Sequence, residues 1–254
     1  MVWLLLITGC STADLISEER LVGLKQIDSD TTADHLRPDV LETIDPFNLY
    51  QEGSSMDVVA TDVWNSTIIR WLTPLDQNEQ HFRANLMLFH KGIEFTFLDG
   101  DQKGKTIGFD GQSYHYEGGG KIYEKSAAIS LYLGPLQHYL EWHRTLMNKK
   151  KLTLLGEKDV NSHPYWVVYA TEGNTSELDQ HDQFLIYINK NSHTIDYIEF
   201  TMRKLMKSYV GVIHYQNYKR VKGKLMPFWI GIADDLVNPG FDHVFTIKTI
   251  RFHQ

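Results

Sequence analysis

The sequence predicts a mainly β fold, built as an antiparallel meander of about ten strands that is closed or nearly closed into a barrel. Two observations predict it. From Asp57 onward, stretches rich in β-branched and aromatic residues alternate with short turn signals. One long helical pattern interrupts them, around residues 135–148. A chain of 254 residues is long enough for one large all-β domain, and we expect residues 57–254 to form it.

The first ten residues differ from the rest of the chain. A short apolar run, Val2–Thr8, is followed by Gly9 and by Cys10, the only cysteine. This pattern resembles the lipobox of bacterial lipoproteins, a signal that is cut just before a cysteine which then carries lipid. The resemblance implies that residues 1–9 are a signal peptide, with an upstream start codon supplying its missing basic segment, and that lipidated Cys10 tethers the protein to a membrane. The alternative is an ordinary buried cysteine.

Residues 11–56 carry the whole net charge of −7, because ten Asp and Glu stand against three Arg and Lys there and the rest of the chain sums to zero. A neutral body lacks the basic face that nucleic-acid binding requires, so we exclude that class of partner. The apolar spacing between Ile16 and Ile27 predicts a short amphipathic helix. Beyond Asp28 the segment is polar and broken by prolines. We interpret residues 10–56 as an acidic tether that contains this helix.

Strand patterns begin at Val58–Trp71 and Phe82–Phe89. The apolar positions change phase at Lys91-Gly92, which predicts a turn or a bulge. Asp110-Gly111 lies between two short apolar stretches and is the strongest hairpin signal in the chain. The C-terminal half predicts further strands around short polar turns: 152–160 with 165–170, 184–188 with 195–202, 209–221 with 225–232, and finally 244–252.

The predicted helix begins at Gly134-Pro135, because proline suits the first helical position. Residues 129–133 predict a separate helical turn before it. The lysines at 149–151 suit the C-terminal end of the helix. Its apolar positions recur at helical spacing: Leu136, Tyr139, Leu140, His143, Leu146 and Met147.

Three local patterns point to a family. Residues 107–116 place aromatic side chains after an Asp-Gly turn, residues 184–195 form two apolar stretches around Asn189, and residues 218–227 run through Lys-Gly-Lys into Met-Pro. Together they resemble the LolA-like group of envelope lipoproteins, which includes the carriers LolA and LolB and relatives such as RseB and LppX. The resemblance implies an incomplete β-barrel with helices across its open face, enclosing a cavity for acyl chains or other hydrophobic ligands. Asn189 departs from the acidic residue that is common there.

A cavity for an apolar ligand needs aliphatic and aromatic lining with few polar anchors. The alternative for any one of the lining candidates is ordinary packing in the core. The candidates are Leu86, Leu88, Phe95 and Phe97 from strands, and Leu136, Leu140, His143 and Met147 from the helix.

The sequence does not favour catalysis, a metal or a cofactor. His138 and His143 are five residues apart, about 140° around a helix, whereas a shared metal favours a spacing of four. We expect His138 to face solvent and His143, on the apolar stripe, to be either a hydrogen-bonded core histidine or one that faces the cavity. The chain contains no Gly-x-Ser-x-Gly elbow, and the glycines at 118–120 lack the lysine of a phosphate-binding loop.

We therefore expect a non-catalytic envelope lipoprotein that binds a lipid or another hydrophobic ligand. Ser11 follows Cys10 in place of the Asp that retains enteric lipoproteins at the inner membrane, so by analogy we expect attachment to the outer membrane, facing the periplasm. One alternative is a sensor or scaffold that binds an envelope protein or peptide on the same fold. A third is an enzyme acting on envelope lipids or glycans, which would need converging His and carboxylate groups.

Overall fold

The computed structural model describes residues 12–27, 32–45, 53–66, 78–90, 92–100, 102–117, 127–149, 152–172, 180–203 and 206–253. Cys10, the predicted lipid site, and the glycines at 118–120 lie outside these residues. Within them the protein is mainly β, as predicted.

Thirteen strands of the described residues form one antiparallel sheet in the order β1-β7-β8-β9-β10-β11-β12-β13-β2-β3-β4-β5-β6. The two outermost strands, β1 and β6, do not pair with each other, so the sheet is an incomplete barrel. The strands are β1 (Lys25–Gln26), β2 (Ser55–Trp64), β3 (Glu79–Met87), β4 (Gly92–Phe97), β5 (Thr106–Asp110), β6 (Tyr114–Glu117), β7 (Leu152–Val160), β8 (His163–Thr171), β9 (Gln183–Asn189), β10 (Ile195–Met202), β11 (Met206–Val221), β12 (Lys224–Ala233) and β13 (His243–His253).

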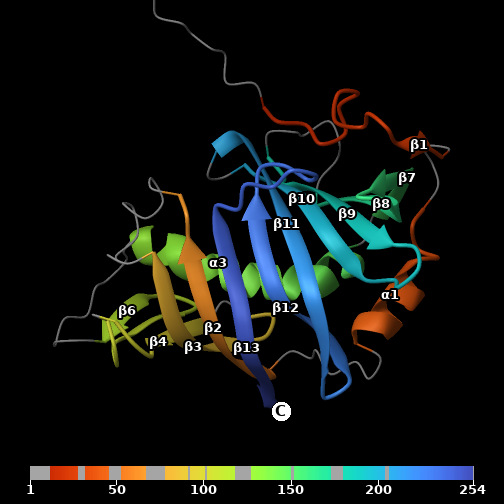
Figure 1. Ribbon diagram of the computed structural model, residues 1–254. Coiled ribbons are helices and arrows are strands. Elements are labelled where there is room, and N and C mark those ends of the chain that lie inside the picture. Colours follow the sequence, from red (N-terminus) through yellow and green to blue (C-terminus); the bar gives the residue numbers. More distant parts are fainter. Residues whose placement is uncertain are drawn as a thin grey trace, which may run out of the picture.

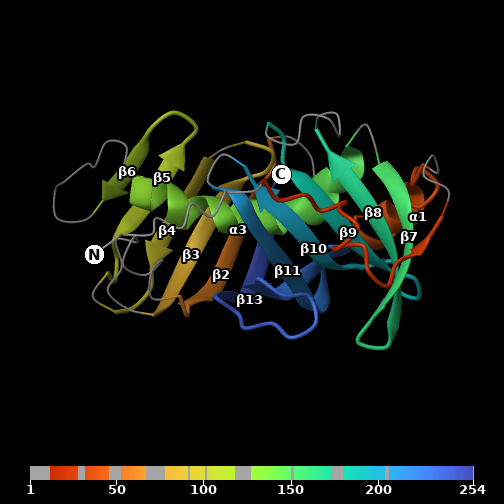
Figure 2. The same cartoon turned by 90° about the horizontal axis from the view of Figure 1, so that it is seen from above.

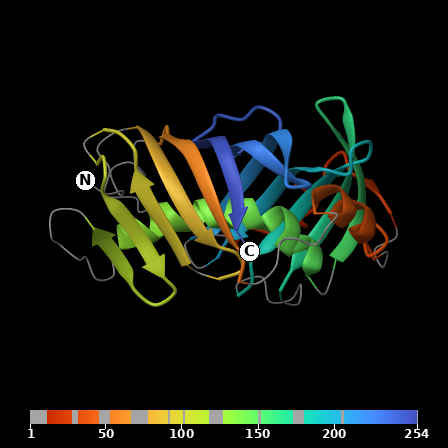
Figure 3. The ribbon, with the colours of Figure 1, turned by 90° about the horizontal axis from the view of Figure 1, so that it is seen from below.

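Helix α3 (Ala127–Thr145) crosses the strands on one side of the sheet, and the 3₁₀ turn η1 (Leu146–Asn148) continues it (Figure 1). Seen along the sheet, the strands curve around α3, with β6 and β7 near opposite ends of the helix (Figures 2 and 3). We call the side of the sheet that faces α3 the inner face. The order of strands, central helix and hairpins follows the predicted one.

Two helix predictions were wrong. Helix α3 begins at Ala127, so Pro135 lies inside it and one backbone hydrogen bond is lost there. Burial of Leu133 and Leu136 against the sheet holds the helix together across the proline. The predicted helix between Ile16 and Ile27 is absent: residues 15–23 form turns, Lys25–Gln26 form strand β1, and Gly23 has a φ of +79° that ends any helical path.

A short helix appears where an irregular stretch was predicted. Helix α1 (Arg37–Ile44) has Pro38 in its first turn, where proline costs no hydrogen bond. Val40 and Ile44 are buried and join the core near the C-terminal end of α3. The acidic N-terminal region therefore contributes packed elements to the fold.

The predicted hairpins are confirmed. They could be predicted because local residues determine their turns. At Asp110-Gly111 the Asp110 carboxylate accepts hydrogen bonds from the amides of Gln112 and Ser113, both 2.8 Å long, and Gly111 has a φ of +102°. Lys222 and Gly223 have φ angles of +50° and +84°, the left-handed pair that a two-residue hairpin needs.

The sheet has an apolar core on each face. Alternation along β8 shows the division: Trp166, Val168 and Ala170 belong to the inner cluster with α3. Tyr165, Val167 and Tyr169 belong to a second cluster on the outer face. Residues 12–27 supply Leu15, Ile16, Leu21 and Leu24 to this second cluster.

Candidate functional site

The inner face of the sheet, together with α3, brings the predicted lining residues into one place. Seven of the eight belong to the continuous inner apolar cluster, and the eighth, His143, lies beside it with its ring 6.3 Å from that of Tyr215. All eight are at most 1% exposed: Leu86, Leu88, Phe95, Phe97, Leu136, Leu140, His143 and Met147. In this conformation their side chains pack together as core.

Aromatic rings that were not among the predicted lining residues complete this face; of these, only Tyr139 was recognised from the sequence, as an apolar position of the helix. Trp142 on α3 lies edge-to-face against Phe184 and Phe200, with ring centroids 5.2 and 5.1 Å apart. Tyr139 contacts Phe200 and Phe245, each at 6.3 Å. The inward alternation of β9, β10 and β13 was the signal that could have found these phenylalanines. The face offers a ligand a large, polarisable and apolar surface.

A polar latch holds the middle of α3 to the turn between β3 and β4. Gln137 donates through Nε2 to the carbonyl oxygen of Met87, at 2.9 Å, and also to that of His90. Glu141 accepts a hydrogen bond of 3.1 Å from the amide of Phe89, a residue with a φ of +62°, and another of 3.0 Å from Gln137. Burial raises the pKa of Glu141, and these hydrogen bonds oppose the shift.

A second latch joins the C-terminal end of α3 to α1. Arg144 donates to the carboxylate of Asp45, the residue that ends α1, and both side chains are buried. Lys224 of β12 lies nearby with its ammonium 3.6 Å from the ring centroid of Phe252, and burial lowers its pKa to about 8 although Asp45 acts against this. Burial, and then the charge of Arg144, lowers the pKa of His143 to about 4, so this histidine is neutral at pH 7.

A buried Asp–His pair sits at the end of β2. Asp62 is fully buried and accepts a hydrogen bond of 3.1 Å from Trp64 Nε1. Its other carboxylate oxygen shares a hydrogen bond with Nε2 of His243. The His243 ring stacks on Trp64 with centroids 3.5 Å apart. Because these groups satisfy each other and tie β2 to β13, we assign the pair a structural role.

The predicted histidines separate as expected: His138 is exposed and His143 is buried. Within the described ranges, no cluster of three or more His, Cys, Asp or Glu has the geometry to hold a metal ion. In that same part of the chain, no helix is both long and apolar enough to cross a membrane.

Comparisons with known proteins give the fold a context. No protein-family model matches the sequence, and no curated protein matches it. Solved structures do match. A putative outer membrane lipoprotein-sorting protein domain from Vibrio parahaemolyticus is 11% identical, with a TM-score of 0.52 over 86% of this chain and 91% of that one. A DUF1329 family protein from Desulfovibrio piger is 10% identical, with a TM-score of 0.50 over 87% and 94%.

A LolA superfamily protein from Nitrosomonas europaea is 14% identical and aligns with a TM-score of 0.49 over 87% of this chain and 93% of that one. At these identities, a likeness is evidence of shared architecture alone. The alignments to the Vibrio and Desulfovibrio structures, which span most of both chains, are what establish it here.

Proposed function

The chain has the fold of the LolA-like proteins, and from this premise we propose that it is a non-catalytic binding protein that takes up a lipid or another hydrophobic ligand between α3 and the sheet. The observation that carries the proposal is the inner face itself. Across the sheet, from β3 through β2, β13, β12 and β11 to β10, this face is apolar and aromatic, and the long helix α3 covers it. One of the proteins of similar fold, from Vibrio parahaemolyticus, is described as a putative outer membrane lipoprotein-sorting protein domain.

The proposed mechanism is displacement of α3 by the ligand. The inner side chains are packed, so an acyl chain enters only where α3 gives up its contacts with them. Moving a chain of about 15 methylenes out of water is worth about 12 kcal/mol, which offsets the loss for a ligand taken up from solution. A chain drawn from a bilayer gains far less, because it is already out of water. The latches at Glu141 and Arg144 are the polar contacts that break or pivot as α3 moves.

We propose further that lipid on Cys10 anchors the mature protein to the outer membrane, facing the periplasm. The support is the apolar run that precedes Cys10 and the Ser at position 11. A lipid-anchored protein with an apolar inner face is suited to hold acyl chains close to the bilayer from which they come.

The test is native mass spectrometry of residues 11–254, purified from a bacterial periplasm without detergent and followed by lipid extraction. A stoichiometric co-purifying lipid supports the proposal. Leu140→Asp, which places a charge on the inner side of α3, should lose the lipid, whereas His138→Asp on the exposed side of the same helix should keep it. Far-UV circular dichroism of both variants checks that each is folded.

A second candidate function is supported by the packing of the inner face. The described inner side chains are already packed against one another, so a ligand between them requires α3 to move. A protein or peptide that binds on the outside of the fold does not require this movement. An apo mass for the wild type, with no uptake of added fatty acid or phospholipid, would refute the hydrophobic-ligand proposal and leave this one.

A further inference from the structure

The segment of residues 12–24, here called the N-terminal strap, lies on the outer face of the sheet before the chain enters the edge strand β1, and it is anchored by a buried side chain. Leu15 is 0% exposed and belongs to the outer cluster with Tyr187 and Leu185. Val22, in the same strap, is 70% exposed. The strap is therefore fixed near its first residues.

Hydrogen bonds fix the beginning of the strap to the start of β9. The amide of Leu15 donates to Gln183 Oε1 at 2.8 Å, and Gln183 Nε2 donates to the carboxylate of Asp14 at 3.0 Å. Arg203 donates to the same Gln183 oxygen at 3.1 Å. The amide of Ala13 donates to the carbonyl oxygen of Lys207 at 3.0 Å, which places residue 13 beside the start of β11.

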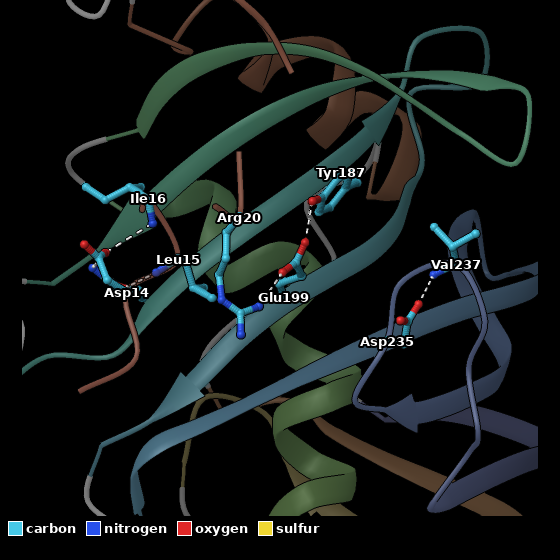
Figure 4. Close-up of polar contacts among 9 residues, drawn as sticks. Asp14, Leu15, Ile16, Arg20, Tyr187, Glu199, Asp235 and Val237 are labelled. Carbon is cyan, nitrogen blue, oxygen red and sulfur yellow. Dashed lines mark hydrogen bonds and ion pairs between the residues drawn. The ribbon is translucent and has the colours of Figure 1, made fainter. Parts of the chain in front are cut away.

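Further along, a charged contact holds the strap to β10. Arg20 reaches across to Glu199, with 3.6 Å between the guanidinium and the carboxylate, and the hydroxyl of Tyr187 donates to the same carboxylate (Figure 4). Glu199 is 7% exposed whereas the Arg20 side chain is 38% exposed, so the carboxylate is shielded from water and the guanidinium is not. Two separate points thus secure the strap to the outer face.

The strap begins at one particular rim of the sheet. Because neighbouring strands are antiparallel, the starts of β9, β11 and β13 and the ends of β10 and β12 share an edge. We call this edge, made of residues 180–183, 203, 206–208 and 234–242, the anchor rim. The opposite edge carries the β9–β10 turn, with exposed Ser192, and the β11–β12 turn.

The anchor rim also presents an apolar side chain. The Asp235 carboxylate accepts a hydrogen bond of 2.7 Å from the amide of Val237 (Figure 4). It accepts another of 2.9 Å from the amide of Asn238, and together they fix the turn between β12 and β13. Val237 stands in this turn and is 50% exposed.

Cys10 precedes Ala13 by three residues, which span at most about 10 Å even when fully extended. We propose that the anchor rim is the membrane-facing surface of the protein, so that β9–β13 stand with this rim on the lipid bilayer and the opposite rim in the periplasm. This inference rests on the proposed lipid anchor, and it adds which surface meets the membrane and which does not.

The experiment uses the full lipidated protein in vesicles of phosphatidylethanolamine and phosphatidylglycerol that carry an acceptor dye on a headgroup lipid. Ser208→Cys labels the anchor rim and Ser192→Cys labels the opposite rim; both serines are exposed, and acylation blocks the thiol of Cys10. The two sites are separated by at least the length of β10, about 25 Å. We expect energy transfer from position 208 to exceed that from position 192 several-fold.

Two further measurements separate the possible failures. Intact mass first establishes the acyl groups on Cys10; their absence would refute both the anchor and the orientation. With the lipid present, equal transfer from the two positions, or more from 192, would refute the orientation alone. In the Ser208→Cys protein, Leu15→Ala should release the strap and reduce transfer, whereas the matched change Val22→Ala should not.

Discussion

His143 is a buried base on the inner side of α3, and its protonation opposes folding. Its pKa is about 4 in the folded protein against 6.5 for an exposed histidine, chiefly because of burial. The folded state binds fewer protons between these values, so stability is lost as the pH falls from 6.5 towards 4. Between pH 7.5 and pH 5 we expect a loss of about 2 kcal/mol from this group. Urea unfolding of wild type and His143→Gln at both pH values measures it; equal losses in the two proteins would refute the assignment.

Glu141 gives the opposite sign. Burial raises the pKa of Glu141 in the folded state above its value in the unfolded chain. Ionisation of this carboxyl therefore lowers the stability as the pH rises from the unfolded-state pKa through the folded-state pKa. Glu141→Gln keeps the oxygen that accepts from the Phe89 amide and removes the charge. We expect it to unfold at higher urea concentration than the wild type at pH 7, whereas Glu141→Ala, which leaves the amide without its acceptor, should lose about 1–3 kcal/mol. A Gln variant that is less stable than the wild type at pH 7 would contradict this account.

At the scale of elements, the Asp45–Arg144 pair joins two helices that are far apart in the sequence. Removing one partner leaves a buried charge, so Arg144→Ala should lose about 3–5 kcal/mol. The double variant Asp45→Ala/Arg144→Ala leaves no lone charge in the pair and should lose much less than the two single changes together. A double-mutant cycle by chemical unfolding provides the measurement, and strict additivity would show that the pair is not coupled.

Elements with local signals could be predicted from the sequence, and elements fixed by distant contacts could not. The hairpins at Asp110-Gly111 and Lys222-Gly223 depend on their own turn residues, and both were found. Pro135 misled the placement of α3, because burial of the helix outweighs the local cost of the proline. The strap was mistaken for a helix, since its apolar residues serve an outer core that no local pattern shows.

The candidate site divides in the same way. Alternation along β3 and β4 and the helical spacing on α3 placed Leu86, Phe95 and Leu140 on the inner face. The latches escaped prediction, because Gln137 and Glu141 meet a β-turn about 50 residues earlier and Arg144 meets a residue 99 positions away. Whether these lining residues contact a ligand stays a prediction.

At the scale of the whole molecule, the sheet is covered unevenly. Strands β8–β10 contribute to the inner cluster with α3 and to the outer cluster with the strap. The outer side of β3 and β4 instead carries polar groups, such as His81, Asn85 and Glu94. Strands buried on both faces open at a higher free energy than strands buried on one face. We therefore expect the half of the sheet around β3–β5 to open at a lower free energy than the half around β8–β10. The Gln137–Glu141 latch connects α3 to this half.

This asymmetry predicts how the protein responds to a ligand in hydrogen-exchange mass spectrometry. If an acyl chain enters by displacing α3 on its β3–β5 side, adding fatty acid should speed amide exchange in α3 and in the β3–β4 turn, where the latch contacts are given up. Exchange in β8–β10 should not change, because the strap and the outer core hold those strands independently of α3. Slower exchange in α3, with the latch still protected, would mean that the ligand enters beside a stationary helix and would contradict displacement. The Val22→Ala variant, altered only at an exposed strap position, should reproduce the wild-type pattern.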